Sequence, residues 1–366
     1  TVAVDGASAM LDGRIKDPLT PAALELMVNA KVTRGAGLTA FTGQRLQNLP
    51  AFTASGKLTD VPNGYAISGV KLATAATTIA GDVAITRGAK RFKVSAKASS
   101  PSLDVSALMR PAAARNAAKP VAAGTRAIPD IPLPLDILRV IDADLDVRFD
   151  TVKLSDAAPF GALLVRATIA DGLFRAEPVQ LAIQAGQSLS MAGTVDAAQS
   201  AWALRIEGAG IDFGEMLARF GHPGAVTGGS TDLSLQLQGQ GKSLAAILGS
   251  ANGEARLKVG PHRVHNFAVD LESGIVLRMF SLANPFRKTE PDTDVRCVAA
   301  RVPVRNGVIT SERNVAAETA RYNAVMSGTV NLRTEVIDAA VTPIVTGGTG
   351  IGDVSTIVQV HGTLAA

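Results

Sequence analysis

The chain of 366 residues is long enough for a large hydrophobic core, and its single cysteine, Cys297, excludes an internal disulfide framework and a cysteine-based zinc site. Its 36 basic and 32 acidic residues leave a net charge of +4. With 4% aromatic residues and no basic stripe, the chain is not expected to bind nucleic acid. Apolar residues reach 47%, yet no apolar run approaches the ~18 residues of a membrane-spanning helix, so a lipid or a partner could cover the excess apolar surface.

Short segments that alternate apolar and polar residues dominate the chain, a pattern typical of β-strands. The opening "TVAVDG" already has this pattern, and we expect the sequence to be an excised piece of a longer protein. Further strands are predicted at residues 91–99, 142–156, 161–171, 179–185, 201–208 and 335–345. Helical periodicity is confined to residues 21–30, 105–118, 134–141, 213–221 and 242–250, which are too short to stand alone and are expected to dock on the sheet.

One strand plan recurs along the chain. Gly81 and Gly193 each follow an apolar-Ala pair and open a strand, a second alternating strand comes next, and an Asp between two apolar residues leads to a short helix. A third copy starts at Gly328, and "HGTL" at residues 361–364 is a candidate fourth. Because the loop lengths vary, the plan predicts an irregular repeat of β-meanders.

An Ala- and Pro-rich stretch separates the first two copies. It is predicted to be helical at first and extended near Pro129, Pro132 and Pro134. The predicted organisation is therefore an N-terminal β segment at 1–110, a connector at 111–134 and a C-terminal β region at 135–366.

The tripeptide Gly241-Lys242-Ser243 superficially resembles part of a nucleotide-binding loop. Such a loop needs a glycine where this chain has Gln236, and it follows a strand that is apolar on both faces. The preceding residues instead alternate leucine with Ser and Gln, which predicts a strand with one wet face, then a turn and a short helix. No nucleotide is expected.

Other polar groups are candidates for metal or catalytic sites. His262 and His265 have the spacing of ligands on a helix, but Pro261 favours a polar turn. Asp142, Asp144 and Asp146 share one face of a strand, and a solvated outer face is favoured over a cation site. The acidic residues at 290, 292 and 294 lack the glycine and glutamate of a calcium loop and are interpreted as turn residues. No Gly-x-Ser-x-Gly elbow is present, so neither an enzyme nor a cofactor is expected.

Apolar strand faces are the candidate functional surface. On strand pattern alone, a closed sandwich in which these faces meet another sheet is the simpler interpretation. The alternative is an open groove. The candidate groove-lining residues are Leu145, Val147, Phe149, Leu163, Val165, Ile169, Val179, Leu181, Ile183, Trp202, Leu204, Ile206, Leu233, Leu235 and Leu237.

Several stretches resemble the AsmA-like family of bacterial envelope proteins. They are "LPLDILRVIDADLDVRFDTVKLSD", "TDLSLQLQGQGKSLAAILGSANGEARLKV", "DTDVRCVAARVPVRNGVITSE" and "MSGTVNLRTEVIDAAVTP", with a similar upstream unit at residues 49–83. The resemblance implies a protein anchored in the inner membrane and facing the periplasm, with strands curled into an apolar groove. It also implies phospholipid movement toward the outer membrane, with membranes or membrane proteins at the groove ends.

The sequence thus predicts a mainly β, elongated fold of antiparallel meander repeats with short helices, curled into a groove that carries phospholipid without catalysis. The competing hypothesis is a structural or assembly protein of the envelope that holds protein partners through exposed strand edges.

Overall fold

The structure is a computed structural model. It describes residues 2–4, 6–17, 22–33, 51–74, 77–105, 126–133, 135–154, 158–220, 222–265, 291–320, 322–345 and 358–364. The chain divides into two compact units: unit 1 holds residues 1–118, 136–154 and 159–179, and unit 2 holds residues 119–135, 155–158 and 180–366. Each unit is described by itself.

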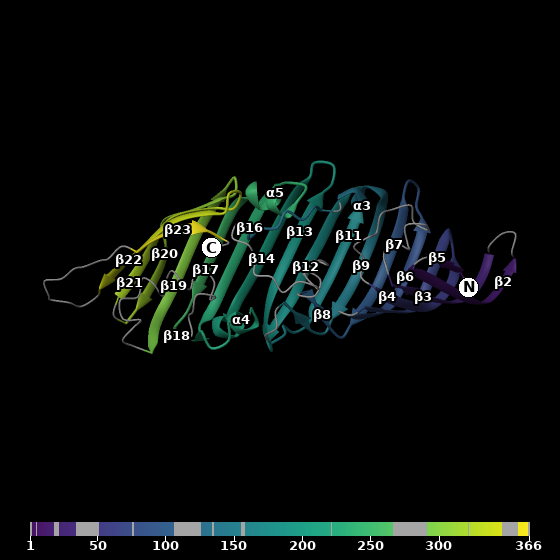
Figure 1. Cartoon of the computed structure of the whole chain (residues 1–366), viewed down its shortest axis with the longest axis horizontal. Coiled ribbons are helices and arrows are strands. Elements are labelled where there is room, and N and C mark those ends of the chain that lie inside the picture. The colour runs from purple at the N-terminus through teal and green to yellow at the C-terminus, as the bar shows by residue number, and fades with distance from the viewer. Residues whose placement is uncertain are drawn as a thin grey trace. The chain divides into compact units, whose positions relative to one another are not determined.

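Unit 1 is an antiparallel meander with one parallel step (Figure 1). Strands β1 to β7 pair in chain order, β7 pairs with β9 in parallel, and β9 pairs with β11 antiparallel. Two short strands, β8 and β10, form a separate parallel pair. The bounds are β1 (Val2–Val4), β2 (Ala7–Asp17), β3 (Ala22–Val32), β4 (Phe52–Val61), β5 (Gly64–Thr74), β6 (Thr78–Arg87), β7 (Phe92–Ser100), β8 (Leu103–Asp104), β9 (Ile141–Phe149), β10 (Val152–Lys153) and β11 (Leu163–Ala170). Helix α3 (Leu135–Val140) and strand β12 (Leu173–Gln184) run across the boundary between the units.

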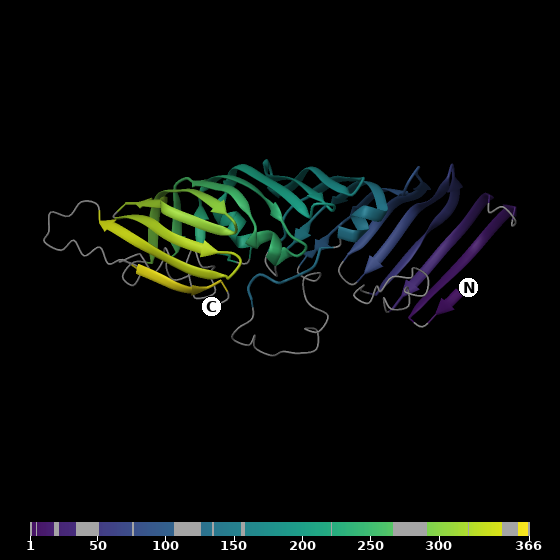
Figure 2. The ribbon, with the colours of Figure 1, turned by 90° about the horizontal axis from the view of Figure 1, so that it is seen from above.

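Unit 2 is a curved antiparallel sheet (Figure 2). Its ladder runs β13, β14, β16, β17, β19, β20, β21, β22, β23, and the short strands β15 and β18 extend it beside β19. The bounds are β13 (Gln187–Asp196), β14 (Ala201–Asp212), α4 (Phe213–Arg219), β15 (Val226–Gly228), β16 (Ser230–Gln240), α5 (Leu244–Gly249), β17 (Asn252–Val259), β18 (His262–His265), β19 (Asp292–Arg305), β20 (Val308–Thr319), β21 (Tyr322–Asn331), β22 (Val336–Val345) and β23 (Val358–Thr363).

The predicted mainly β fold with meander repeats and short helices is confirmed, and three of the predicted helices are α3, α4 and α5. Side chains stop two of the strands by capping the helices that follow. Asp212 accepts a hydrogen bond from the backbone N–H of Glu215 at 2.9 Å, and Ser243 accepts one from Ala246 at 3.3 Å. Gly-Lys-Ser is thus the turn between strand β16 and helix α5, as its sequence context predicts.

The helix predicted at residues 21–30 is wrong, because this segment is strand β3. Its Leu, Glu and Met favour a helix locally, but it hydrogen-bonds to β2 on one side and β4 on the other. Leu24 and Leu26 are buried while Glu25 and Met27 are exposed, which is the period of a strand. Residues 106–118 of the second predicted helix lie outside the described residues, and the predicted domain boundaries remain a prediction.

The recurring glycine of the repeat has a steric cause. In β6 a Cβ on Gly81 would collide with the carbonyl oxygen of Lys97 on the neighbouring strand. In β21 a Cβ on Gly328 would collide with the carbonyl oxygen of Asp338, and Gly328 has a φ of +133°, which other residues rarely adopt. At these two positions, glycine therefore lets the neighbouring strand pack closely.

The clearest core lies between strands β20, β21 and β22 of unit 2. Ala324, Ile337, Ala339 and Val341 are all at most 5% exposed, and the half-buried Met326 packs against them. Along β22 the buried residues alternate with exposed or half-buried ones. The buried face of β22 therefore provides most of this strand's contribution to the stability of unit 2.

We expect Ile337→Ala to destabilise unit 2 by about 2–5 kcal/mol, because it leaves a cavity among packed aliphatic side chains. Val336, the preceding residue, is 48% exposed on the other face, so Val336→Ala should cost less than about 0.5 kcal/mol. Urea unfolding of the two variants measures the difference, and equal losses would contradict the assigned faces.

Candidate functional site

One face of the unit 2 sheet is aliphatic, and strand register aligns its residues across the sheet. In the β14–β16 pair, Leu204 lies opposite Leu237 and Ile206 opposite Leu235. Because directly opposed residues of an antiparallel pair point to the same face, these side chains form one apolar surface. Trp202 and Leu233 continue it at the two ends of these rows.

The same face continues through the later strands. Leu235 lies opposite Ala255, which lies opposite Val302. In a parallel row, Val304 pairs with Ile309, Ile309 with Val330 and Val330 with Ile337. We call this surface, from β13 to β23, the apolar face of unit 2.

The opposite face of the same strands is charged and ion-paired. Glu254 is 2.8 Å from Arg301 on the neighbouring strand and also contacts Arg256 on its own strand. These guanidinium groups, Arg301 first, lower the pKa of the Glu254 carboxyl. Arg296 and Glu318 form another pair at 3.1 Å. Charge on this face favours contact with water.

Unit 1 has the same asymmetry in β9 and β11. Leu163 lies opposite Phe149, Val165 opposite Val147, and Ala167 opposite Leu145. Ile169, another predicted groove residue, lies opposite Ala143 on the same face. These predicted residues are therefore brought together on one side of the sheet.

The aspartate row lies on the other side of β9, opposite cations. Lys93 is 2.6 Å from Asp144, and this hydrogen bond raises the pKa of Lys93. Arg91 approaches Asp142 at 3.4 Å, and Arg166 approaches Asp146 at 3.9 Å. The row is a set of partly exposed ion pairs, in agreement with its interpretation as an outer face.

The three predicted residues of β12 also follow the strand period. Leu181 and Ile183 are buried and Val179 is half-buried, whereas Gln180 and Gln184 at the alternate positions are exposed. Leu233, Leu235 and Leu237 in β16 are half-buried, whereas Gln236 and Gln238 are exposed. The predicted residues therefore belong to the less exposed face of each strand.

Unit 1 also contains a hollow of about 560 Å³ at the middle of strands β5, β6, β7, β9 and β11. Ile67, Val83, Ala96, Leu145 and Ala167 contribute to its wall, one residue from each strand. Charged neighbours, among them Lys97, Asp146 and Arg166, also line it. The hollow thus combines apolar and charged groups over a single sheet.

The histidine pair lies on strand β18, so the predicted polar turn is wrong. Residues three apart on a strand point to opposite faces, which separates the two rings. His262 is buried, with Nδ1 2.8 Å from the carbonyl oxygen of Gly260. His265 Nδ1 is 2.7 Å from Asp292 and its Nε2 is 2.8 Å from Thr227. In the described part of the chain, no cluster of His, Cys, Asp and Glu could hold a metal ion.

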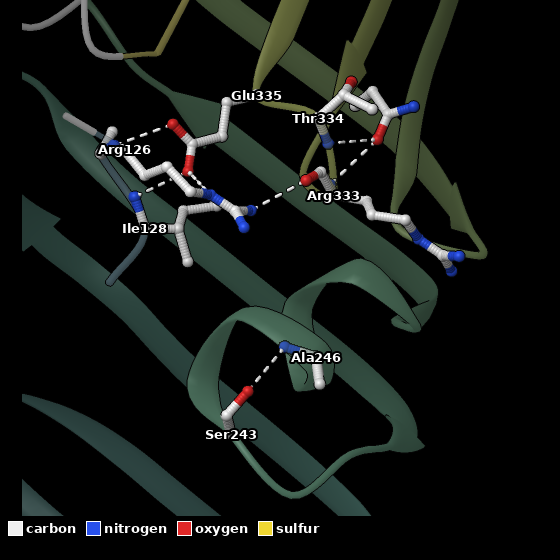
Figure 3. A network of polar contacts seen from close by, with 9 residues as sticks. Arg126, Ile128, Ser243, Ala246, Arg333, Thr334 and Glu335 are labelled. Atoms are coloured by element: carbon white, nitrogen blue, oxygen red, sulfur yellow. Dashed lines mark hydrogen bonds and ion pairs between the residues drawn. The ribbon is translucent and has the colours of Figure 1, made fainter. Parts of the chain in front are cut away.

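A polar network in unit 2 was missed by the sequence analysis (Figure 3). The Glu335 carboxylate, with its side chain 4% exposed, accepts hydrogen bonds from the backbone N–H groups of Ala127 and Ile128 at 2.8 and 3.0 Å. Arg126 Nε donates a third at 3.1 Å. Burial opposes ionisation, but these donors outweigh it and lower the pKa of Glu335. No pattern in the sequence links residues more than 200 positions apart.

Comparison with protein families identifies the chain. The model of the AsmA family matches residues 22–313, which is most of its length. The chain belongs to the AsmA family. This membership supports an envelope-related role. No curated protein and no solved structure matches the chain. Within the described ranges, no helix has the length and apolar character needed to cross a membrane.

The buried His262 predicts a pH dependence of stability. Burial lowers its pKa from 6.5, so the folded state favours the neutral ring and the unfolded chain binds a proton more readily. Stability should therefore be fully present above the unfolded pKa and fall as the pH drops below about 6.5. We expect His262→Phe, which keeps a ring beside Phe213, to weaken the loss of urea midpoint between pH 7 and pH 5. Identical pH slopes would contradict this role.

Proposed function

We propose that this AsmA family protein moves phospholipid without catalysis, with acyl chains lying on its apolar strand faces and head groups in water. The proposal places the protein in the periplasm between the inner and outer membranes, which are its proposed partners. The observation that carries it is the in-register aliphatic surface of unit 2, backed by a charged face on the same strands.

Partial exposure favours an open surface over a closed sandwich. Leu204, Leu235 and Leu237 lie in the middle of the sheet, yet each keeps part of its surface exposed. At the interface of two packed sheets such leucines would be fully buried. The exposed aliphatic area needs a cover, and acyl chains have the matching chemistry.

The energetics suit transport as well as binding. Moving one CH₂ group from water to apolar surroundings is worth about 0.8 kcal/mol, so an acyl chain leaves a membrane only along a continuous apolar path. Rows such as Ile206–Leu235–Ala255–Val302 contain only aliphatic side chains of similar chemistry. A chain sliding along them exchanges like for like and meets no tight site.

Strand β16 allows a matched test, since Leu235 and Gln236 are neighbours on opposite faces. A photo-crosslinker at Leu235 should capture phospholipid in the cell envelope, whereas the same group at Gln236 should not. Leu235→Asp should stay folded, because the carboxylate on an open face keeps some hydration, but it should abolish capture by neighbouring probes. Gln236→Asp should leave both properties unchanged.

Thermal melting of both aspartate variants separates the alternatives. Equal labelling at the two positions would refute lipid passage over this face. Wholesale unfolding by Leu235→Asp would point to a closed sandwich, which offers a buried carboxylate no water.

A further inference from the structure

The described end of the predicted connector, residues 126–133, forms a strap beside the N-terminal end of helix α5 in unit 2. At one end, Glu335 holds Ala127 and Ile128, and Arg126 Nη2 donates to the carbonyl oxygen of Arg333 at 2.8 Å. At the other end, Leu133 N–H donates to the Lys242 carbonyl and Leu244 N–H donates to the Ile131 carbonyl, both at 2.9 Å. The strap thus connects the turn before β22 with the turn before α5.

Helix α5 is clamped from both ends by this arrangement. The strap holds its first residue, Leu244, and the Arg333 guanidinium donates to the carbonyl oxygen of its last residue, Gly249, at 2.6 Å. The carbonyl oxygen of Arg333 also accepts from Arg126 (Figure 3). The strap, the helix and the turn before β22 therefore form one closed circuit of contacts. We call α5 together with residues 126–133 the cap.

The cap covers one end of the apolar face. Ile247 of α5 packs against the cluster of Trp202, Ala251 and Val304, beside Leu204 and Leu237. Trp202 is 8% exposed, and its indole N–H has no hydrogen-bond partner among the described residues. A buried N–H donor without an acceptor is unfavourable, so this position favours a ligand that brings a hydrogen-bond acceptor.

At the β22 end of the strap, Glu335 accepts three of the four hydrogen bonds, and the carbonyl oxygen of Arg333 accepts the fourth. Ile131 is 50% exposed and Arg126 is largely exposed, while Ile128 is buried, so the strap has few apolar contacts along its length. Glu335 itself has a φ of +65°, a left-handed conformation that is unfavourable for a residue with a side chain. Its three hydrogen bonds to the strap compensate for this conformation.

We propose that the cap is a latch-controlled cover of a ligand site at Trp202: loss of the Glu335 contacts frees the strap and α5 and exposes the indole N–H on the apolar face. The acceptor that fits this site is the ester carbonyl oxygen of a phospholipid, whose acyl chains match Leu204 and Leu237. This ligand assignment rests on the proposed function, whereas the latch does not.

Trp202 is the only tryptophan in the chain, so its fluorescence reports on this site alone. In the wild-type protein its emission should be blue-shifted and weakly quenched by acrylamide. Glu335→Gln keeps the shape of the side chain but removes its charge and one acceptor, and it should shift the emission to the red and raise the quenching constant several-fold. Glu318→Gln, the same change at an exposed ion pair, should match the wild type.

Thermal melts accompany each spectrum. If Glu335→Gln unfolds unit 2, the Arg126→Ala variant tests the latch in its place, because it weakens the same contacts from the exposed side of the strap. A folded Glu335→Gln or Arg126→Ala protein with wild-type quenching would overturn the latch.

Phosphatidylcholine vesicles with brominated acyl chains test the ligand separately. Stronger bromine quenching of Trp202 in the latch variants than in the wild type supports the ligand site. Acrylamide access without bromine quenching in any variant would keep the latch and refute the lipid ligand. Equal bromine quenching in the wild type and the latch variants would support lipid contact and overturn control by the cap.

Discussion

The two-residue period of paired strands is the constraint on which this structure depends. Because successive side chains point to opposite faces, a shift of one residue in any pair would move its aliphatic side chains to the charged face. The register holds in each unit, so Leu163 meets Phe149 in unit 1 and Leu204 meets Leu237 in unit 2. Local irregularities restore this period. The register of the β14–β16 pair shifts between Gly208 and Ile211; beyond the shift Ile211 is again buried, and β14 ends at the Asp212 cap.

The charged faces contribute to the solubility of the protein more than to its free energy of unfolding. Exposed ion pairs such as Arg296 with Glu318 contribute little to the free energy of unfolding. They do make the opposite surface unfavourable for apolar ligands and for packing against another sheet. A sheet with two aliphatic faces would invite aggregation on both sides, whereas the ion pairs leave one apolar side.

The sequence predicts strands and faces well because both are local properties. Alternation over Leu233 to Leu237 is visible in five residues, and it decides which side of β16 is apolar whatever lies beside the strand. The segment 21–30 was predicted wrongly because its residues favour a helix locally and its two neighbouring strands override that preference. His262 and His265 were assigned to a turn, although the alternation that identified other strands places them on opposite faces of β18.

Long-range polar contacts are outside the reach of such reasoning. Glu335 is the first residue of a predicted strand and Arg126 lies in a Pro-rich connector, and their spacing carries no periodic signal. Extension near Pro132 was predictable, because proline disfavours a helix at the residue before it, but the turns that receive the segment were not. Contacts of this kind are decided by the folded sheet, which brings the turn before β22 close to the turn before α5.

The end of the apolar face near Trp202 differs chemically from the rest of it. The rows named above are aliphatic and offer no directional contact, so they give an apolar ligand no preferred position. At this end small residues make room for the indole: a Cβ on Gly239 would lie 3.1 Å from Trp202 Nε1 and 2.7 Å from Ser250 Oγ. A single hydrogen-bond donor at one end of the surface can position a ligand there without slowing the movement of that ligand along the remainder. A cover over this donor is useful, because a permanently exposed indole N–H would hydrogen-bond to water and would no longer favour a ligand that brings an acceptor.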